Sequence, residues 1–264
     1  DANKVHPITG NVLEEHYWHR QDEKGYPYFA APSYEKGPRS GTFRDKSTIW
    51  DAAARRVSLR AAGNEFVAFQ VIVEKGAEPI KGLGVAVSDL AGPEGAKIDA
   101  GRNVDVFVEH YINVFSRARD PWKLETYYGD RFWFPDGLIP VTAQGWDRVD
   151  LPEPRLNVAG QTVQGFWIDL YVPHKTKAGL YRGKLTVSAQ DVPAQQLDLQ
   201  LEVLPWDLSD ELSFIFELNT YGTGFAESFR ARSQDQVARI EEAFHKMAHE
   251  HRCTLNIFPG KPTT

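Results

Sequence analysis

Hydrophobic and polar residues alternate through the middle of this chain, between residues 57 and 203. Short runs of branched, aliphatic and aromatic residues recur there, separated by glycine, proline and other turn residues. A period of two over a short run is typical of a β-strand with one buried face. Little helical periodicity lies between the runs, so the pattern predicts an antiparallel, immunoglobulin-like β-sandwich over residues 51–205. The expected strands cover residues 57–61, 66–73, 83–87, 104–114, 165–172, 179–187 and 196–203.

The same alternation predicts which side chains fill the core of this sandwich. Every second residue of a strand lies on the same face, so the large apolar residues of one phase are expected to be buried together. The expected core includes Phe66, Phe69, Val71, Val106, Val108, Trp167, Leu185 and Val187.

A different pattern follows residue 210. Residues 212–219 and residues 254–258 are two apolar runs of strand length. Between them, Ser233 and Gln236 have the spacing of a helix-capping box. The apolar residues after this cap recur at steps of three and four, the period of one buried helical face. These residues are Val237, Ile240, Phe244 and Met247.

Two apolar strands joined by one helix favour parallel pairing under a crossover helix. Two parallel strands alone cannot bury both of their faces. We therefore expect residues 206–264 to be the first β-α-β unit of an incomplete TIM-type (β/α)8 barrel. The missing strands are expected from the remainder of the barrel in the same gene product or from a second chain that completes it.

The first fifty residues have neither pattern. Residues 1–50 are rich in glycine, proline, charge and aromatic side chains, as in residues 26–29 and 37–41. This composition predicts an extended segment that wraps around the sandwich, and a short helix after Asn11 is compatible with it.

Composition excludes some classes of protein. The 264 residues are 42% hydrophobic and 25% charged, which is normal for a folded globular chain. A net charge of −6 without a basic stripe argues against a nucleic-acid partner. No apolar run is long enough to span a membrane. Because the chain begins at Asp1 and has Met247 as its only methionine, we expect an exported protein that is secreted or periplasmic.

Three segments resemble the bacterial glycoside hydrolases of family 123 and their uncharacterised relatives: residues 60–73, 134–140 and 166–187. In the last segment a strand ends at a Val-Pro pair, and an Ala-Gly-x-Tyr-x-Gly turn leads into the next strand. Proline lacks a backbone donor, and a small residue permits close packing. We therefore expect Pro173 to end a strand and Gly183 to allow a close contact, while Gly179 supplies turn flexibility.

The resemblance implies an N-terminal β-sandwich followed by a catalytic (β/α)8 barrel. It also implies hydrolysis of N-acetyl-hexosaminides in which the substrate's own 2-acetamido group attacks the anomeric carbon. In this mechanism an adjacent Asp-Glu pair on the barrel orients that group and acts as acid and base. The chain contains such pairs at residues 22–23 and 210–211. The first lies in the polar entry segment. The second stands at the amino end of the first barrel strand, whereas barrel chemistry occurs at the carboxyl ends. No catalytic residue is therefore assigned here, and the pair is expected beyond residue 264.

Five residues are candidates for binding a saccharide. Asn219 and Asn256 each stand near the carboxyl end of an expected barrel strand, and Tyr221 follows the first of them. Their amide and hydroxyl groups suit sugar hydroxyls, but the same residues also serve as barrel-rim architecture. Trp122 and Trp133 belong to a dense aromatic stretch over residues 121–134. Its rings suit the apolar faces of pyranose rings or, alternatively, an interface between sandwich and barrel.

No metal or cofactor site is expected. His245 and His249 have the spacing of a zinc helix, but Lys246 replaces the glutamate that a metalloprotease needs after its first histidine. His16 and His19 lack a third ligand. No phosphate loop, dinucleotide fingerprint or Gly-x-Ser-x-Gly motif is present.

These observations favour the N-terminal portion of an exported glycoside-hydrolase-like protein, with carbohydrate as its partner. The chain alone is expected to be inactive. The alternative is a non-catalytic surface or assembly protein that binds a glycan or a partner protein through the same scaffold.

Overall fold

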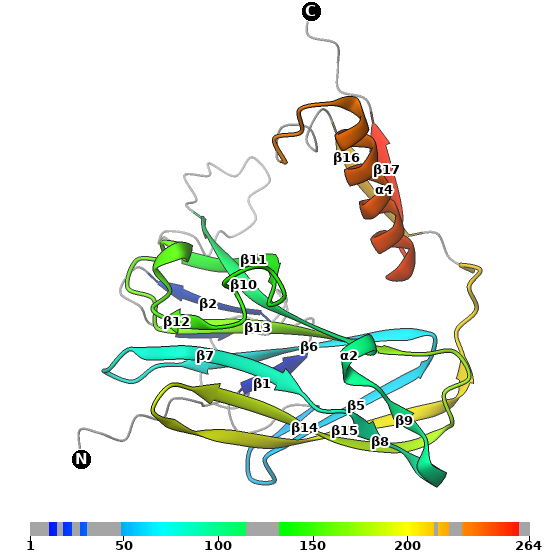
Figure 1. The fold of residues 1–264 in the computed structure, drawn as a ribbon, viewed down its shortest axis with the longest axis horizontal. Coiled ribbons are helices and arrows are strands. Elements are labelled where there is room, and N and C mark those ends of the chain that lie inside the picture. Colours follow the sequence, from blue (N-terminus) through cyan, green and yellow to red (C-terminus); the bar gives the residue numbers. More distant parts are fainter. Residues whose placement is uncertain are drawn as a thin grey trace, which may run out of the picture. The chain divides into compact units, whose positions relative to one another are not determined.

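The computed structural model describes residues 11–14, 18–22, 27–30, 49–114, 132–213, 216–221 and 229–258, with the backbone path alone before residue 49. The chain divides into two compact units, Asp1–Asp207 and Leu208–Thr264. Among the described residues, the first unit is mainly β-structure, and the second contains a helix and two strands (Figure 1).

The first unit contains a seven-stranded sheet in which every described pair is antiparallel. Its longest pairing is between β6 and β13, in which ten residues of each strand are in register. In spatial order the strands are β1 (Asn11–Glu14), β6 (Glu65–Glu74), β13 (Val163–Val172), β10 (Val104–Val114), β11 (Phe132–Pro140), β2 (Trp18–Asp22) and β3 (Pro27–Ala30).

The second sheet has eight strands, and one of its pairs corrects the expected antiparallel pattern: β5 and β15 are parallel. The preceding strand β4 pairs with β5 in an antiparallel hairpin, but β6, which follows β5, lies in the other sheet, so the second edge of β5 is left for the distant strand β15. In spatial order the main strands are β12 (Val149–Leu151), β7 (Ile80–Val87), β14 (Gly179–Ala189), β15 (Val192–Asp207), β5 (Arg56–Gly63) and β4 (Trp50–Asp51). Beside β14 lies β8 (Leu90–Ala91), which in turn pairs with β9 (Lys97–Ile98).

Short helical turns join some of these strands. They are η1 (Pro93–Gly95), α2 (Ala100–Asn103) and η2 (Pro154–Leu156). All seven strands that the alternation predicts are present, with boundaries that differ by a few residues. Strand β15 extends beyond its expected end at residue 203, through Pro205 to Asp207.

The two sheets lie as two layers and share one hydrophobic core, as in a β-sandwich (Figure 1). Strand alternation explains this core well in β15, where buried leucines alternate with more exposed polar residues. Five of the eight expected core residues are confirmed as fully buried: Phe69, Val71, Val108, Leu185 and Val187.

The other three expected core residues are only half-buried. Val106 packs at the margin of the core. Phe66 and Trp167 have the opposite strand phase to Phe69 and Phe166, so they lie on the outer face of the seven-stranded sheet. On that face Phe66 contacts the ring of Tyr171, and the Trp167 indole donates a hydrogen bond to Asp169 Oδ1 at 2.6 Å. The prediction for these two aromatics was wrong because both phases of β6 and β13 carry apolar residues.

Two further local expectations need correction. Asn11–Glu14 is strand β1, paired with β6, and not a helix. The end of the aromatic stretch, where no strand is expected, also belongs to a strand, because Phe132–Pro140 forms β11 against β10. Its prolines are tolerated since β2 is in register only with Phe132 and Trp133, which leaves the rest of β11 at an edge.

The second unit has the predicted order of strand, helix and strand. Its elements are β16 (Glu217–Tyr221), α4 (Gln234–Glu250) and β17 (Thr254–Phe258). The predicted parallel pairing of the two strands is confirmed. The first strand begins at Glu217, later than the apolar run suggests, and residues 214–215 lie outside the described residues.

The helix start follows the predicted cap with one change of partner. The Ser233 hydroxyl accepts a hydrogen bond from the Gln236 backbone N–H. The Gln236 side chain returns to the backbone N–H of Arg232, one residue earlier than in a standard capping box.

The apolar face of α4 is covered only in part by the described residues. Val237, Ile240 and Phe244 are half-buried, and Met247 is 49% exposed. Ala248 is the buried residue of the helix. The predicted burial of Met247 was therefore wrong, because Ala248 occupies the buried position beside it.

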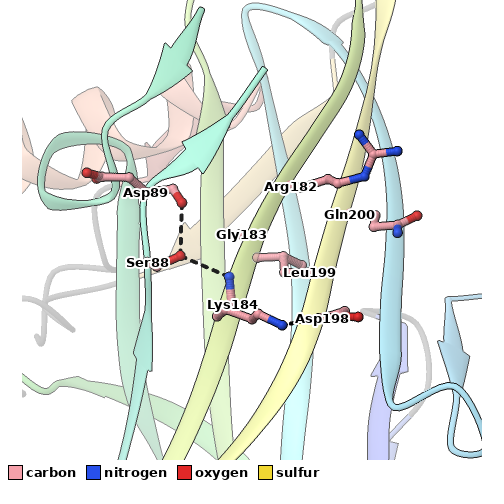
Figure 2. A pocket seen from close by; sticks show the side chains of 8 residues that line it. All are labelled: Ser88, Asp89, Arg182, Gly183, Lys184, Asp198, Leu199 and Gln200. Atoms are coloured by element: carbon pink, nitrogen blue, oxygen red, sulfur yellow. Dashed lines mark hydrogen bonds and ion pairs between the residues drawn. The ribbon is translucent and has the colours of Figure 1, made fainter. Parts of the chain in front are cut away.

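Gly183 allows the close contact that its place in the motif predicts. A Cβ atom there would lie 3.0 Å from the Asp89 carbonyl oxygen and 3.1 Å from Ser88 Oγ. Figure 2 shows Ser88 between Asp89 and Lys184. The Ser88 hydroxyl donates a hydrogen bond to the Asp89 carbonyl oxygen and accepts one from the Lys184 backbone N–H. The expected behaviour of its neighbours is also confirmed, since β13 ends immediately before Pro173 and Gly179 has a φ of +134°.

Replacing Phe69 by alanine should lower the free energy of unfolding by about 3–5 kcal/mol, because the ring is fully buried. Chemical denaturation followed by tryptophan fluorescence measures the change. Leu180→Ala is the control, since Leu180 is 36% exposed and its truncation should cost less than about 1 kcal/mol. Equal losses in both variants would contradict the assigned core.

Gly183→Ala should destabilise the first unit by about 1–3 kcal/mol, because β8 and β14 must separate to admit a methyl group. Gly76→Ala is the matched control, because no atom lies within 4 Å of the added Cβ and its effect should stay within about 0.5 kcal/mol. Thermal melting of the two variants checks the difference. A Gly183→Ala variant as stable as the control would show that the contact is not restrictive.

Candidate functional site

Two asparagines lie side by side in the parallel strands, each two residues before the carboxyl end of its strand. Asn219 of β16 and Asn256 of β17 are direct register partners. The Asn256 amide nitrogen lies 3.4 Å from Asn219 Oδ1 in a hydrogen bond. Asn219 is exposed and Asn256 is half-buried. The structure therefore brings together two of the five candidate residues.

The position of this amide pair follows from strand pairing. Parallel strands end at the same edge of a sheet, so polar residues near two carboxyl ends meet there. Each primary amide has one carbonyl oxygen and two N–H donors, and one mutual hydrogen bond leaves most of this capacity available. The pair can therefore bind a ligand that both donates and accepts hydrogen bonds, such as a vicinal diol or an amide.

The other three candidates are not placed beside this pair by the described structure. Tyr221 is the last residue of β16, in register with Phe258, and its side chain lies outside the described residues. Trp122 also lies outside the described residues. Trp133 belongs to β11 of the first unit, where it is half-buried against a cluster around Tyr111.

The residues considered for catalysis or for metal binding form no cluster in the described part of the chain. Asp210 and Glu211 precede β16 and so lie before its amino end. Among the described residues, no group of three or more His, Cys, Asp or Glu side chains could hold a metal ion. His245 and His249 are exposed on α4. Within the same residues, no helix is long and apolar enough to cross a membrane.

A buried polar network, which the sequence reasoning missed, lies at one end of the seven-stranded sheet. Gln164 of β13 is fully buried, and its amide nitrogen donates to the carbonyl oxygens of Glu109 at 3.0 Å and Gly165 at 2.7 Å. The Tyr111 hydroxyl accepts from the Gly165 N–H at 2.8 Å. Glu109 is itself only 2% exposed.

The network continues into the loop that follows β12. The Gln161 amide nitrogen donates to Gln164 Oε1 at 2.9 Å, and Gln161 Oε1 accepts from the Glu153 N–H at 2.7 Å. Both nitrogens of one edge of Arg155 bind the Glu153 carboxylate, at 2.6 and 2.8 Å. The Arg155 guanidinium lies 3.9 Å from the ring centre of Trp146. The loop is thus fastened to the sheet by polar contacts.

Burial and pairing shift the pKa values of this network in opposite directions. Burial raises the pKa of Glu109 to about 8, and it also raises the pKa of Tyr111, with the nearby Glu109 carboxyl adding to the rise. For Glu153, burial alone would raise the pKa, but hydrogen bonds from the Arg155 side chain and from backbone N–H groups lower it to about 2.

Only a weak sequence signal pointed to this network. Alternation in β10 places Glu109 and Tyr111 opposite to Val106 and Val108, on a face that is expected to meet solvent. Residues of the loop, including Leu156, pack on Tyr111 and cover that face instead. The sequence signal for a polar network was the presence of two glutamines, at residues 161 and 164, next to an expected strand.

Stability should fall as pH rises from 5 to 8, because the folded chain keeps the Glu109 proton that the unfolded chain releases near its ordinary pKa of 4.5. The slope from this carboxyl is at most about 1.4 kcal/mol per pH unit. Glu109→Gln should remove that component, while Glu78→Gln, at an exposed position, should retain it. Urea unfolding at several pH values measures the free energy of unfolding. Parallel pH profiles for wild type and Glu109→Gln would disprove the effect.

Glu153 affects stability in the opposite direction. Its pKa is lowered in the folded chain, so its contribution to stability is lost only as pH falls below 4.5.

Comparisons with known proteins identify the first unit. The family model of the glycoside hydrolase 123 N-terminal domain matches residues 43–189. No curated protein matches the chain. Two solved structures with weak similarity are AvmM, which catalyses macrocyclization in alchivemycin A biosynthesis, and self-complemented MyfA, the major subunit of Myf fimbriae from Yersinia enterocolitica. Their TM-scores are 0.30 and 0.27, with 11% identity in both; they cover 58% and 55% of this chain and 87% and 89% of their own. Similarity this low supports no inference.

A more similar structure is a family 123 glycoside hydrolase from Clostridium perfringens, described in a study of glycolipid glycan hydrolysis. The TM-score is 0.57 at 14% identity, and the match covers 74% of this chain and 32% of that chain. The present chain thus spans about a third of that enzyme, and the similarity shows a common fold. With the family model matching more than half of its residues, this chain belongs to the glycoside hydrolase 123 N-terminal domain family.

Proposed function

We propose that this chain is the N-terminal portion of an exported glycoside hydrolase that acts on N-acetyl-hexosaminides. Family membership supports a glycoside-hydrolase-like protein with a carbohydrate substrate. The Clostridium perfringens enzyme, described in a study of glycolipid glycan hydrolysis, supports a glycan as the substrate class. A secreted or periplasmic location is part of the proposal, because extracellular glycans are available there.

One observation supports a location for the sugar-binding site. The second unit pairs β16 and β17 in parallel and places Asn219 and Asn256 together near their carboxyl ends. We infer that this unit is the first β-α-β of a (β/α)8 barrel, in which the carboxyl ends of the strands form the mouth of the active site. The amide pair would then lie at that mouth.

The inferred roles follow from this position. The two amides bind hydroxyl or acetamido groups of the sugar and so help to orient it. The substrate's 2-acetamido group acts as the nucleophile, and the Asp-Glu pair that assists it lies beyond residue 264. Tyr221, Trp122 and Trp133 remain proposed sugar contacts. No residue of this chain is assigned as the acid or the base.

The 264-residue chain alone should not hydrolyse an aryl N-acetyl-hexosaminide, whereas the full gene product that includes the barrel should. Within the full product, Asn219→Ala or Asn256→Ala should lower kcat/KM up to about tenfold, the value of one hydrogen bond of about 0.5–1.5 kcal/mol. Asn113→Ala is the matched control, an exposed asparagine of β10 that should leave kcat/KM unchanged. Release of the chromogenic aryl group measures the rates.

Two results would contradict the proposal. Turnover by the 264-residue chain, abolished by a change within it, would place the catalytic residues here. A full product that binds N-acetylated oligosaccharides without cleaving any of them would favour a non-catalytic glycan-binding protein on the same scaffold.

A further inference from the structure

A surface cavity of about 410 Å³ lies beside the first turns of α4 and is lined by three arginines. Arg230 and Arg232 precede the helix, and Arg239 comes from its second turn. Gln236 and the apolar side chains of Phe229 and Ile240 complete most of the lining. A chain with a net charge of −6 thus gathers three positive charges around one hollow.

The polar side-chain groups of this cavity are hydrogen-bond donors. In the described part of the chain, no carboxylate forms an ion pair with Arg230, Arg232 or Arg239. The side-chain carbonyl oxygen of Gln236 accepts a hydrogen bond from the Arg232 backbone N–H at 2.6 Å. The NH₂ group of Gln236 remains as a hydrogen-bond donor. Guanidinium groups only donate. Such a lining is complementary to an acceptor-only group that carries negative charge.

The groove in Figure 2 provides a contrast. It is lined by Ser88 and Asp89, which lie between β7 and β8, and by residues of β14 and β15, and it has a similar volume, about 460 Å³. Its Lys184 forms an ion pair with Asp198, and Asp89 pairs with Lys97. Acidic and basic side chains are thus balanced in the lining of this groove. Unlike the arginine cavity, it has no excess of positive charge that would attract an anion.

The arginine cavity lies at the start of α4, the end of the helix that follows the carboxyl end of β16. A helix that connects two parallel strands runs back against them, so its first residues are at the carboxyl ends of those strands. Asn219 and Asn256 are near those ends. Phe229 adds an aromatic ring that is 54% exposed and packs edge-on against Phe244, with 5.6 Å between ring centres. An exposed ring suits the apolar face of a sugar.

We propose that this cavity binds the anionic substituent, a sulfate ester or a carboxylate, of an acidic glycan. The inference rests on the proposed function in taking a glycan as ligand, and it adds acidity as the feature that is recognised. The arginines bind the oxyanion with charge-assisted hydrogen bonds, and Phe229 packs against the sugar that carries it.

Calorimetric titration of the 264-residue chain with three oligosaccharides tests the proposal. The probes are a chondroitin 4-sulfate tetrasaccharide, its desulfated form, which keeps the uronate carboxylates, and neutral N-acetylchitotetraose. We expect the sulfated probe to bind more tightly than the neutral one. Arg230→Gln combined with Arg239→Gln should weaken its binding about tenfold or more. Retained affinity for the desulfated probe would assign recognition to the carboxylate, and its loss would assign recognition to the sulfate.

The matched control is the double variant Arg102→Gln with Arg182→Gln, which removes the same charge from exposed arginines of α2 and β14. It should bind the sulfated probe within about twofold of wild type, since nonspecific attraction alone depends on total charge. Circular dichroism melting confirms that all variants fold. Three results would overturn the proposal: no binding by wild type, equal binding of the neutral probe, or equal losses in the two double variants.

This outcome is separate from that of the hydrolysis assay. The aryl N-acetyl-hexosaminide carries no anionic substituent, so its turnover does not depend on the arginines. If the full product hydrolyses the aryl substrate but the arginine substitutions do not weaken binding of the sulfated probe, the proposal of an acidic ligand is refuted and the catalytic proposal stands. Arginine-dependent binding without hydrolysis would refute the catalytic proposal alone.

Discussion

The apolar layer between the two sheets is the interaction on which the rest of the first unit depends. Phe69 and Val71 meet Phe166 and Ile168 across the β6–β13 pair, and leucines of β15 fill the layer from the opposite sheet. Close packing makes such a layer intolerant of volume changes. Close packing also explains the glycine at residue 183, because β8 approaches β14 so closely that no methyl group fits there.

A buried polar network adjoins this apolar layer at one end of the seven-stranded sheet. The loop after β12 is held there by a chain of contacts from Arg155 and Glu153 through Gln161 and Gln164 to the backbone of β10. A satisfied buried network of this kind specifies one arrangement of the loop, because each unmade bond would leave a desolvated group. The half-buried Trp133 packs on the neighbouring apolar cluster, so its surroundings are set by the same loop.

The second unit has a different character, in which chemistry collects at one edge. Its helix buries Ala248 but leaves Met247 largely exposed, and Leu218 of β16 is 42% exposed. Amides and arginines meanwhile lie toward the carboxyl ends of the strands, which is where parallel β-α structures bind ligands. Under the proposals made above, the neutral amide pair binds the N-acetylated sugar and the arginine cavity binds its acidic substituent.

The amino-acid sequence by itself determined the strands, the parallel β-α-β unit and the asparagine pair, because strand alternation and helix capping are local signals. It could not determine which face of β6 and β13 is buried, since Phe66 and Phe69 are equally apolar. It also could not show that β5 pairs in parallel with β15, that Glu109 is buried, or that Arg230 and Arg239 line one cavity. Those features depend on segments that meet only in the folded chain, where packing, and not local propensity, decides which groups lose contact with water.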